Sequence, residues 1–171
     1  MRPTFWQRLD QLARKLTPVA LTLLLVIVGQ IPWHLPGLAR VAPLLPLTAV
    51  YHWTIQRPDL LPAQAVFCIG LLVDLLSGGP IGVNTLVFLT VYGVIYSQRR
   101  FFIGKTFHIT WLGFALVAAA AALQAWLLVS IFYTILIRPD ALMFQYILTV
   151  VLYPVPAWLF LRWQQVFLRA I

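Results

Sequence analysis

Six apolar stretches, separated by short polar or turn-forming gaps, divide the chain. They cover approximately residues 16–35, 41–55, 61–76, 82–96, 108–137 and 142–161. A helix that crosses the roughly 30 Å hydrocarbon core of a bilayer needs about 20 apolar residues, with some variation for tilt and thickness. The pattern therefore predicts an all-α polytopic membrane protein with six transmembrane helices, of which the fifth is long enough to tilt or protrude.

The residues before the first stretch have a periodicity of their own. Phe5, Leu9, Leu12 and Leu16 recur at helical spacing, and the basic residues lie largely off that stripe. This pattern indicates a short amphipathic helix on the cytoplasmic membrane surface. We therefore expect a cytoplasmic segment, 1–15, a six-helix transmembrane domain, 16–162, and a cytoplasmic tail, 163–171.

Composition supports a membrane location. The chain is 62% hydrophobic and 9% charged, and its mean hydropathy is +0.92. A soluble core of 171 residues cannot bury that many apolar side chains. An isoelectric point near 10.4 would suggest a nucleic-acid partner for a soluble protein, but the positive charges are divided among short loops and no nucleic-acid-binding motif accompanies them.

Lysine and arginine are distributed unevenly between the gaps. Ten of the twelve lie in the N-terminal segment, the second and fourth gaps and the C-terminal tail, whereas Arg40 and Arg138 lie in the first and fifth gaps. Short loops rich in Lys and Arg stay in the cytoplasm. The charge pattern predicts an inner-membrane protein with both termini in the cytoplasm.

Asp74 is the one acidic residue well inside a predicted span. A carboxylate in hydrocarbon costs roughly 2.5 kcal/mol or more, so it normally faces the bundle interior or water. Helical spacing places Phe67, Gly70 and Asp74 on one face, and Gly70 would let another helix approach the carboxylate. Asn84, just past the Gly-Gly-Pro turn, is a local donor. Three roles for Asp74 stay open: organising the turn, lining a ligand pocket or contacting a partner.

The fifth stretch carries a stripe of small side chains at helical spacing. Its members are Ala115, Ala118, Ala119, Ala122 and Ala125. Small residues let a neighbouring backbone approach closely in a membrane. The stripe predicts a packing surface for another helix of this chain or for the membrane helix of a partner.

The sequence disfavours an enzyme. It contains no Glu, and three of its four Asp residues lie in the tail or in loops, so no pair of intramembrane carboxylates is available for acid–base catalysis. His34, His52 and His108 are scattered near span ends, where we expect interfacial positions, and none has a Cys or a second His at metal-ligand spacing. We expect no catalytic residue, no metal and no cofactor.

The hairpin of the third and fourth stretches contains the run Phe67-x-x-Gly70-Leu71-x-x-Asp74-Leu75-x-Ser77-Gly78-x-Pro80-Ile81-Gly82. This run resembles the signature of the MreD family of rod shape-determining proteins. Further similarity lies in Arg57-Pro58, Arg138-Pro139-Asp140 and Tyr153-Pro154. The candidate structural, pocket or partner residues of the hairpin are Phe67, Gly70, Asp74, Gly78, Pro80, Gly82 and Asn84.

The resemblance implies a non-enzymatic inner-membrane component of the bacterial elongasome, the machinery that maintains rod shape. Such proteins bind the bitopic periplasmic protein MreC and, through it, the actin-like MreB filament and the peptidoglycan synthases. The family also resembles the membrane substrate-binding subunits of energy-coupling-factor transporters. This similarity keeps an internal ligand pocket among the alternatives.

The polar residues offer a modest pocket at most. The polar residues available in addition to Asp74 are Gln30, Gln64, Asn84 and Gln124. One acid with a few amides makes a poor proton relay. The alternative function is a small-molecule-binding membrane subunit of an uptake transporter. Recruitment of an ATPase would distinguish it from a scaffold.

Overall fold

The computed structural model describes residues 5–30, 43–136 and 140–167, with side chains described for 16–30, 43–136 and 140–165, and these residues form helices joined by turns. The elements are α1 (Phe5–Gly29), α2 (Leu45–Gln56), the 3₁₀ turn η1 (Pro58–Leu60), α3 (Ala63–Ser77), α4 (Val83–Phe102), α5 (Phe107–Tyr133), α6 (Asp140–Leu152) and α7 (Pro154–Phe167).

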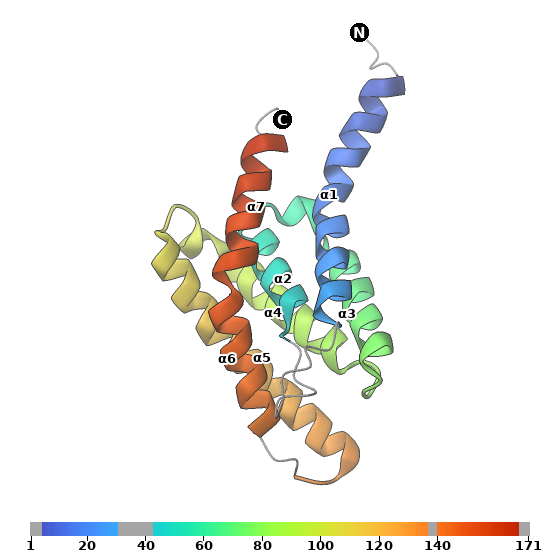
Figure 1. Cartoon of the computed structure of the whole chain (residues 1–171), viewed down its shortest axis with the longest axis vertical. Helices are drawn as coiled ribbons and strands as arrows, with labels where there is room; N and C mark the ends of the chain where they lie inside the picture. The colour runs from blue at the N-terminus through green and yellow to red at the C-terminus, as the bar shows by residue number, and fades with distance from the viewer. Residues whose placement is uncertain (1–4, 31–42, 137–139, 168–171) are drawn as a thin grey trace.

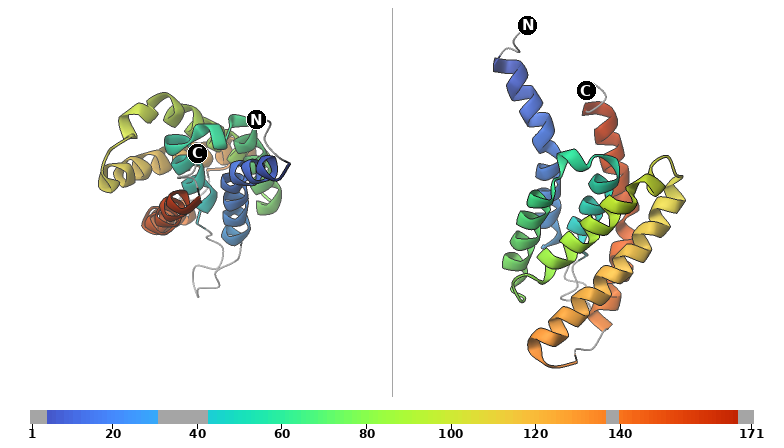
Figure 2. Two further views of the ribbon diagram at one scale, coloured as in Figure 1. Left: turned by 90° about the horizontal axis from the view of Figure 1, so that it is seen from above. Right: turned by 180° about the vertical axis from the view of Figure 1, so that it is seen from behind.

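The helices run back and forth between two ends of the molecule (Figure 1). α1 begins and α7 ends at one end, together with the α2–α3 and α4–α5 connections, and we call this the terminal end. The α3–α4 turn and the facing ends of α5 and α6 lie at the opposite end, the hairpin end (Figure 2). This arrangement fits a helical membrane protein.

Within the described residues, two helical segments are long and apolar enough to cross a membrane by length and composition. They are α5, with 27 residues, and the α6–α7 unit over Asp140–Gln165, with 26 residues. The parts Leu16–Gly29 of α1 and Ala63–Ser77 of α3 are shorter apolar helices. At 1.5 Å per residue α5 is about 40 Å long. It lies obliquely across the bundle and extends past α3 and α4 at the hairpin end (Figure 2).

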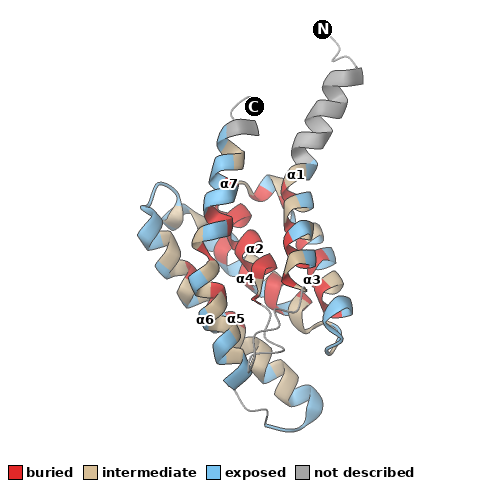
Figure 3. Ribbon diagram, viewed as in Figure 1, coloured by how far each residue is buried: buried red, intermediate tan, exposed pale blue. Residues whose placement is uncertain are grey.

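α2 lies at the centre of the core. All residues of this helix from Leu45 to Ile55 are buried, and the helix lies at the centre of the buried region (Figure 3). Twelve residues span only about 18 Å, and α1, α4 and α7 pack around them. The Tyr51 hydroxyl donates to the Thr110 carbonyl of α5 at 2.9 Å. Its ring packs edge-on against Phe114 and Tyr153, so aromatic side chains join α2 to α5 and to the junction of α6 and α7.

The structure changes two expectations about the first half of the chain. The segment that we expected to form a separate surface helix is the first part of α1, which runs unbroken from Phe5 to Gly29. Pro18 lies inside α1, and membrane helices tolerate a proline where neighbouring groups or local adjustments of the helix satisfy the freed backbone atoms. His52 is 5% exposed rather than interfacial. His34 lies outside the described residues, and His108 is exposed.

The last helical unit is interrupted at Tyr153, between α6 and α7. Proline lacks an N–H, so Pro154 leaves the carbonyl of Val150, four residues earlier, without its usual helical donor. The Trp111 indole N–H of α5 donates to that carbonyl at 3.0 Å. An unpaired carbonyl is costly in a membrane. Trp111 therefore pairs the carbonyl that Pro154 leaves open, and this hydrogen bond links α5 to the α6–α7 unit.

Candidate functional site

The α3–α4 hairpin is built around Asp74. This side chain is 1% exposed, and its carboxylate accepts four hydrogen bonds from the start of α4. The donors are the N–H groups of Gly82 (2.9 Å), Asn84 (2.8 Å) and Thr85 (3.1 Å) and the Thr85 hydroxyl (2.7 Å). The first N–H groups of a helix have no partner within it. Asp74 supplies that partner from α3, and its negative charge faces the positive end of the α4 dipole.

The backbone of the turn needs its glycines. Gly78 ends α3 with φ 66° and Gly82 begins α4 with φ 102°, a region that side-chain-bearing residues rarely adopt. Between them, the half-buried Pro80 accepts a hydrogen bond on its carbonyl from the Val83 N–H at 3.4 Å. These three residues set the position of the α4 N–H groups above Asp74.

Gly70 lies one turn before Asp74, at the closest approach of α3 and α4. A Cβ built on Gly70 would lie 2.5 Å from the Cα of Thr85 and 3.1 Å from its nitrogen. The missing side chain therefore lets Thr85 come near enough to give Asp74 both of its hydrogen bonds. The close approach expected from Gly70 is present in the structure.

The last two candidates are Phe67 and Asn84. Phe67 shares a helical face with Asp74 by spacing, but it is 47% exposed, whereas Asp74 is buried. Asn84 is the local donor expected from the sequence, and it donates to Asp74 through its backbone N–H. The candidates brought together are Gly70, Asp74, Gly82 and Asn84, with Gly78 and Pro80 shaping the turn between them.

A cavity of about 550 Å³ lies beside this hairpin at the hairpin end. The hairpin contributes Ser77, Pro80 and Asn84, and Gln30 at the end of α1 lies on the wall as well. Parts of α2, α5 and α6 complete the lining, including Tyr133 and Gln145. Gln64 is exposed and Gln124 donates to the Thr90 hydroxyl at 3.1 Å, so neither belongs to this cavity.

The comparison with protein-family models decides the family. The model described as rod shape-determining protein MreD matches residues 10–166, which is most of the chain. The chain belongs to the MreD family. Membership implies a role in determining rod shape, in a family of membrane proteins. No curated protein and no solved structure matches the chain.

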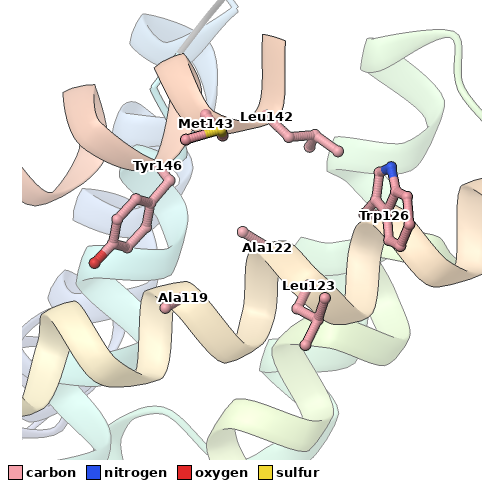
Figure 4. Close-up of a pocket in the computed structure, with 7 residues that line it drawn as sticks. All are labelled: Ala119, Ala122, Leu123, Trp126, Leu142, Met143 and Tyr146. Atoms are coloured by element: carbon pink, nitrogen blue, oxygen red, sulfur yellow. The ribbon is translucent and has the colours of Figure 1, made fainter. Parts of the chain in front are cut away.

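The alanines of the stripe in this MreD-family chain do not share one surrounding. Ala118 is 3% exposed and faces the core of the chain itself. Ala119 and Ala122 line an apolar groove of about 340 Å³ between α5 and α6. Figure 4 shows these alanines opposite Met143 and Tyr146 of α6, with Trp126 at one end. Ala115, one turn before Ala118, is partly buried and does not line the groove.

The contacts of the MreD-family hairpin fit a structural role for Asp74. Both oxygens of the carboxylate accept hydrogen bonds from donors at the start of α4. Among the described residues, no three His, Cys, Asp or Glu side chains gather in a group that could hold a metal ion.

Sequence reasoning missed one residue that fixes the hairpin and two that join other helices. Thr85 gives Asp74 two hydrogen bonds, and the signal that could have identified it is its place in the first turn of a helix, where backbone N–H groups need partners. Trp111 has an aromatic side chain near a span end, which predicts only an interfacial position. Gly113 lies against the Phe102 ring and the Tyr51 hydroxyl, a contact between helices that sequence spacing does not reveal.

Proposed function

We propose that this protein is a non-enzymatic component of the bacterial elongasome in the inner membrane, where it binds an MreC-like bitopic periplasmic protein. Through that partner it links the actin-like MreB filament and peptidoglycan synthesis. The observation that carries the proposal is the match of the MreD family over residues 10–166. Partner binding and the link to the filament go beyond this match.

The proposed topology has six crossings with both termini in the cytoplasm. The described basic residues of the connections, Arg57, Arg99, Arg100 and Lys105, belong to the α2–α3 and α4–α5 connections or to the helix end next to them. These connections lie at the terminal end (Figure 1). Since basic loops stay in the cytoplasm, this placement supports a cytoplasmic terminal end. Arg40 and Arg138 lie outside the described residues.

The proposed partner surface is the groove between α5 and α6. A transmembrane helix of the partner could pack against Ala119 and Ala122, since helices in lipid associate through close packing at small side chains. The lining is nearly all apolar, and Met143 and Leu123 are 59% and 58% exposed within the chain alone. A bitopic protein offers one such helix.

Two substitutions on the same stripe test this surface. Ala122→Leu should fill the groove and reduce co-purification of the MreC-like protein in mild detergent, while the chain still accumulates in the membrane. Ala118→Leu is the matched control, because it overfills the chain's own core and should lower accumulation and thermal stability instead. Partner recovery that is unchanged by Ala122→Leu would exclude the groove as the interface.

The cavity at the hairpin end favours a second candidate, a small-molecule-binding subunit of an uptake transporter. Its volume of about 550 Å³ and its mixed polar and apolar lining fall within the range of ligand pockets. This second candidate also includes the proposal that the fold is similar to that of the membrane subunits of energy-coupling-factor transporters. Recovery of an ATPase module and a bound vitamin-like molecule, without a periplasmic partner, would favour it over the scaffold.

A further inference from the structure

The end of α4 and the start of α5 form a corner that concentrates positive charge at the terminal end. We define the basic corner as residues 96–107. It contains Arg99, Arg100 and Lys105, and no acidic residue. Lys105 folds back toward α4, because its N–H donates to the Phe102 carbonyl at 3.2 Å. The three cations therefore lie within one short stretch of chain around the α4–α5 connection, which lies at the periphery of the bundle (Figure 2).

Aromatic rings hold two of these cations. The Arg99 guanidinium lies 4.9 Å from the centroid of the Tyr96 ring, and the Lys105 ammonium lies 5.5 Å from that of Phe101. Such stacking attracts a cation to the face of a ring while the N–H groups at its edge stay available. The ring and the cation then present one amphipathic surface.

Two of the three cations are turned outward. Arg100 and Lys105 are exposed, whereas Arg99 is half-buried. Asp59 of η1 is the acidic residue described at this end, and it acts electrostatically on Tyr92 of α4, as Arg99 does. Among the described residues no carboxylate forms an ion pair with the three cations, so Arg100 and Lys105 carry positive charge that faces the surroundings of the protein.

Large apolar side chains lie in the same corner and are equally exposed. Phe101 is 62% exposed, Ile103 57% and Phe107 41%. A soluble acidic protein would leave these side chains in water, whereas the boundary between headgroups and acyl chains accommodates cations and apolar groups side by side. The combination points to a lipid.

We propose that the basic corner is a docking site for an anionic phospholipid, whose headgroup phosphate contacts Arg99, Arg100 and Lys105 while its acyl chains lie against Phe101 and Ile103. Anionic headgroups attract clustered cations near a membrane surface. The inference needs the membrane location of the chain. It does not depend on the partner or on which end is cytoplasmic.

The chain offers a matched control for charge. Arg57 and Arg162 lie outside the basic corner, and Arg162 is stacked on Trp158 at 5.6 Å. Arg57 lies in the α2–α3 connection and Arg162 on α7. The double variants Arg99→Gln/Lys105→Gln and Arg57→Gln/Arg162→Gln each remove two charges, but only the first removes them from one cluster.

The full chain in detergent is titrated with phosphatidylglycerol and with phosphatidylcholine, and bound lipid is counted by native mass spectrometry. For the wild type we expect tighter binding of phosphatidylglycerol, on the order of tenfold or more. The corner variant should lose most of this preference, and the control variant should keep it. Raising the salt from about 50 to about 500 mM should weaken the wild-type preference, a measurement that needs no variant.

Several results would overturn the proposal. Equal losses in the two double variants would mean that net charge attracts lipid without a site. A preference that survives in the corner variant, or that is insensitive to salt in the wild type, would place the lipid elsewhere. Displacement of phosphatidylglycerol by a soluble hexaglutamate peptide, but not by glycerol phosphate, would assign the corner to an acidic protein segment instead.

Discussion

At the scale of single residues, Asp74 shows how a carboxylate is accommodated in an apolar helix. Placing Asp in a membrane segment costs roughly 2.5 to 3.5 kcal/mol at the centre of a span. Four hydrogen bonds from α4 offset this cost, and bonds to a charged group contribute about 1.5 to 3 kcal/mol each. The same bonds pair N–H groups that α4 would otherwise leave open.

Substitution of Asp74 should separate a structural role from ligand chemistry. In Asp74→Asn the amide oxygen can keep the three bonds made by Oδ2, but the NH₂ group then faces the Asn84 N–H, at a cost of about 1 to 3 kcal/mol. Asp74→Leu loses all four bonds and should accumulate poorly. Membrane abundance, thermal stability and cell shape are measured, with Asp59→Asn as the control in an exposed acid. An abundant but inactive Asn variant would contradict the structural role.

Gly70 and Gly93, each inside a helix, make a matched pair. Gly70→Ala forces a Cβ against the backbone of Thr85, so α3 and α4 must separate, and overpacking of this kind costs about 1 to 3 kcal/mol. Gly93 lies in α4, and a Cβ added there would have no neighbouring atom within 4 Å. Gly93→Ala should therefore be neutral or stabilise by up to about 1 kcal/mol. Thermal unfolding in detergent compares the two, and equal effects would mean that the close approach of α3 and α4 is not tight.

At the scale of helices, the break between α6 and α7 depends on a contact from α5. Trp111→Phe removes the donor to the Val150 carbonyl and should destabilise the chain by about 1 to 3 kcal/mol. Pro154→Ala restores a helical N–H for that carbonyl. In the Pro154→Ala background the same Trp111→Phe substitution should therefore cost less, by about 1 kcal/mol in a double-mutant cycle. Additive effects would mean that the indole and the proline are independent.

The sequence predicts much of the hairpin and less of the helix arrangement. Gly70 and Asp74, spaced one turn apart before a glycine-rich turn, are sufficient to predict the close approach of α4. Phe67 follows the same spacing but lies outside the contact, since periodicity defines a face and not how far the next helix covers it. An apolar run such as 41–55 has the same pattern whether lipid or protein surrounds it. The burial of α2 on every side therefore appears only in three dimensions.

At the scale of the whole molecule, charge and topology point to the same orientation. The α4–α5 connection, with its three cations, lies at the end where α1 begins and α7 ends, whereas the α3–α4 turn carries no charged residue and lies at the other end. Short basic loops are retained in the cytoplasm. The proposed inner-membrane topology with six crossings therefore predicts Gly79 outside and Gln98 inside.

Cysteine labelling of intact cells tests this orientation. Cys68 is exposed and is first replaced by Ser, after which Gly79→Cys and Gln98→Cys are introduced singly. Gly79 is the suitable turn position, because Gly78 and Gly82 have positive φ while Gly79 does not, and Gln98 is exposed without carrying a charge that itself directs topology. An impermeant maleimide should label position 79 in intact cells and position 98 only after lysis. Labelling of position 98 alone would reverse the orientation, and labelling of both would refute the arrangement in which α4 crosses the membrane between them.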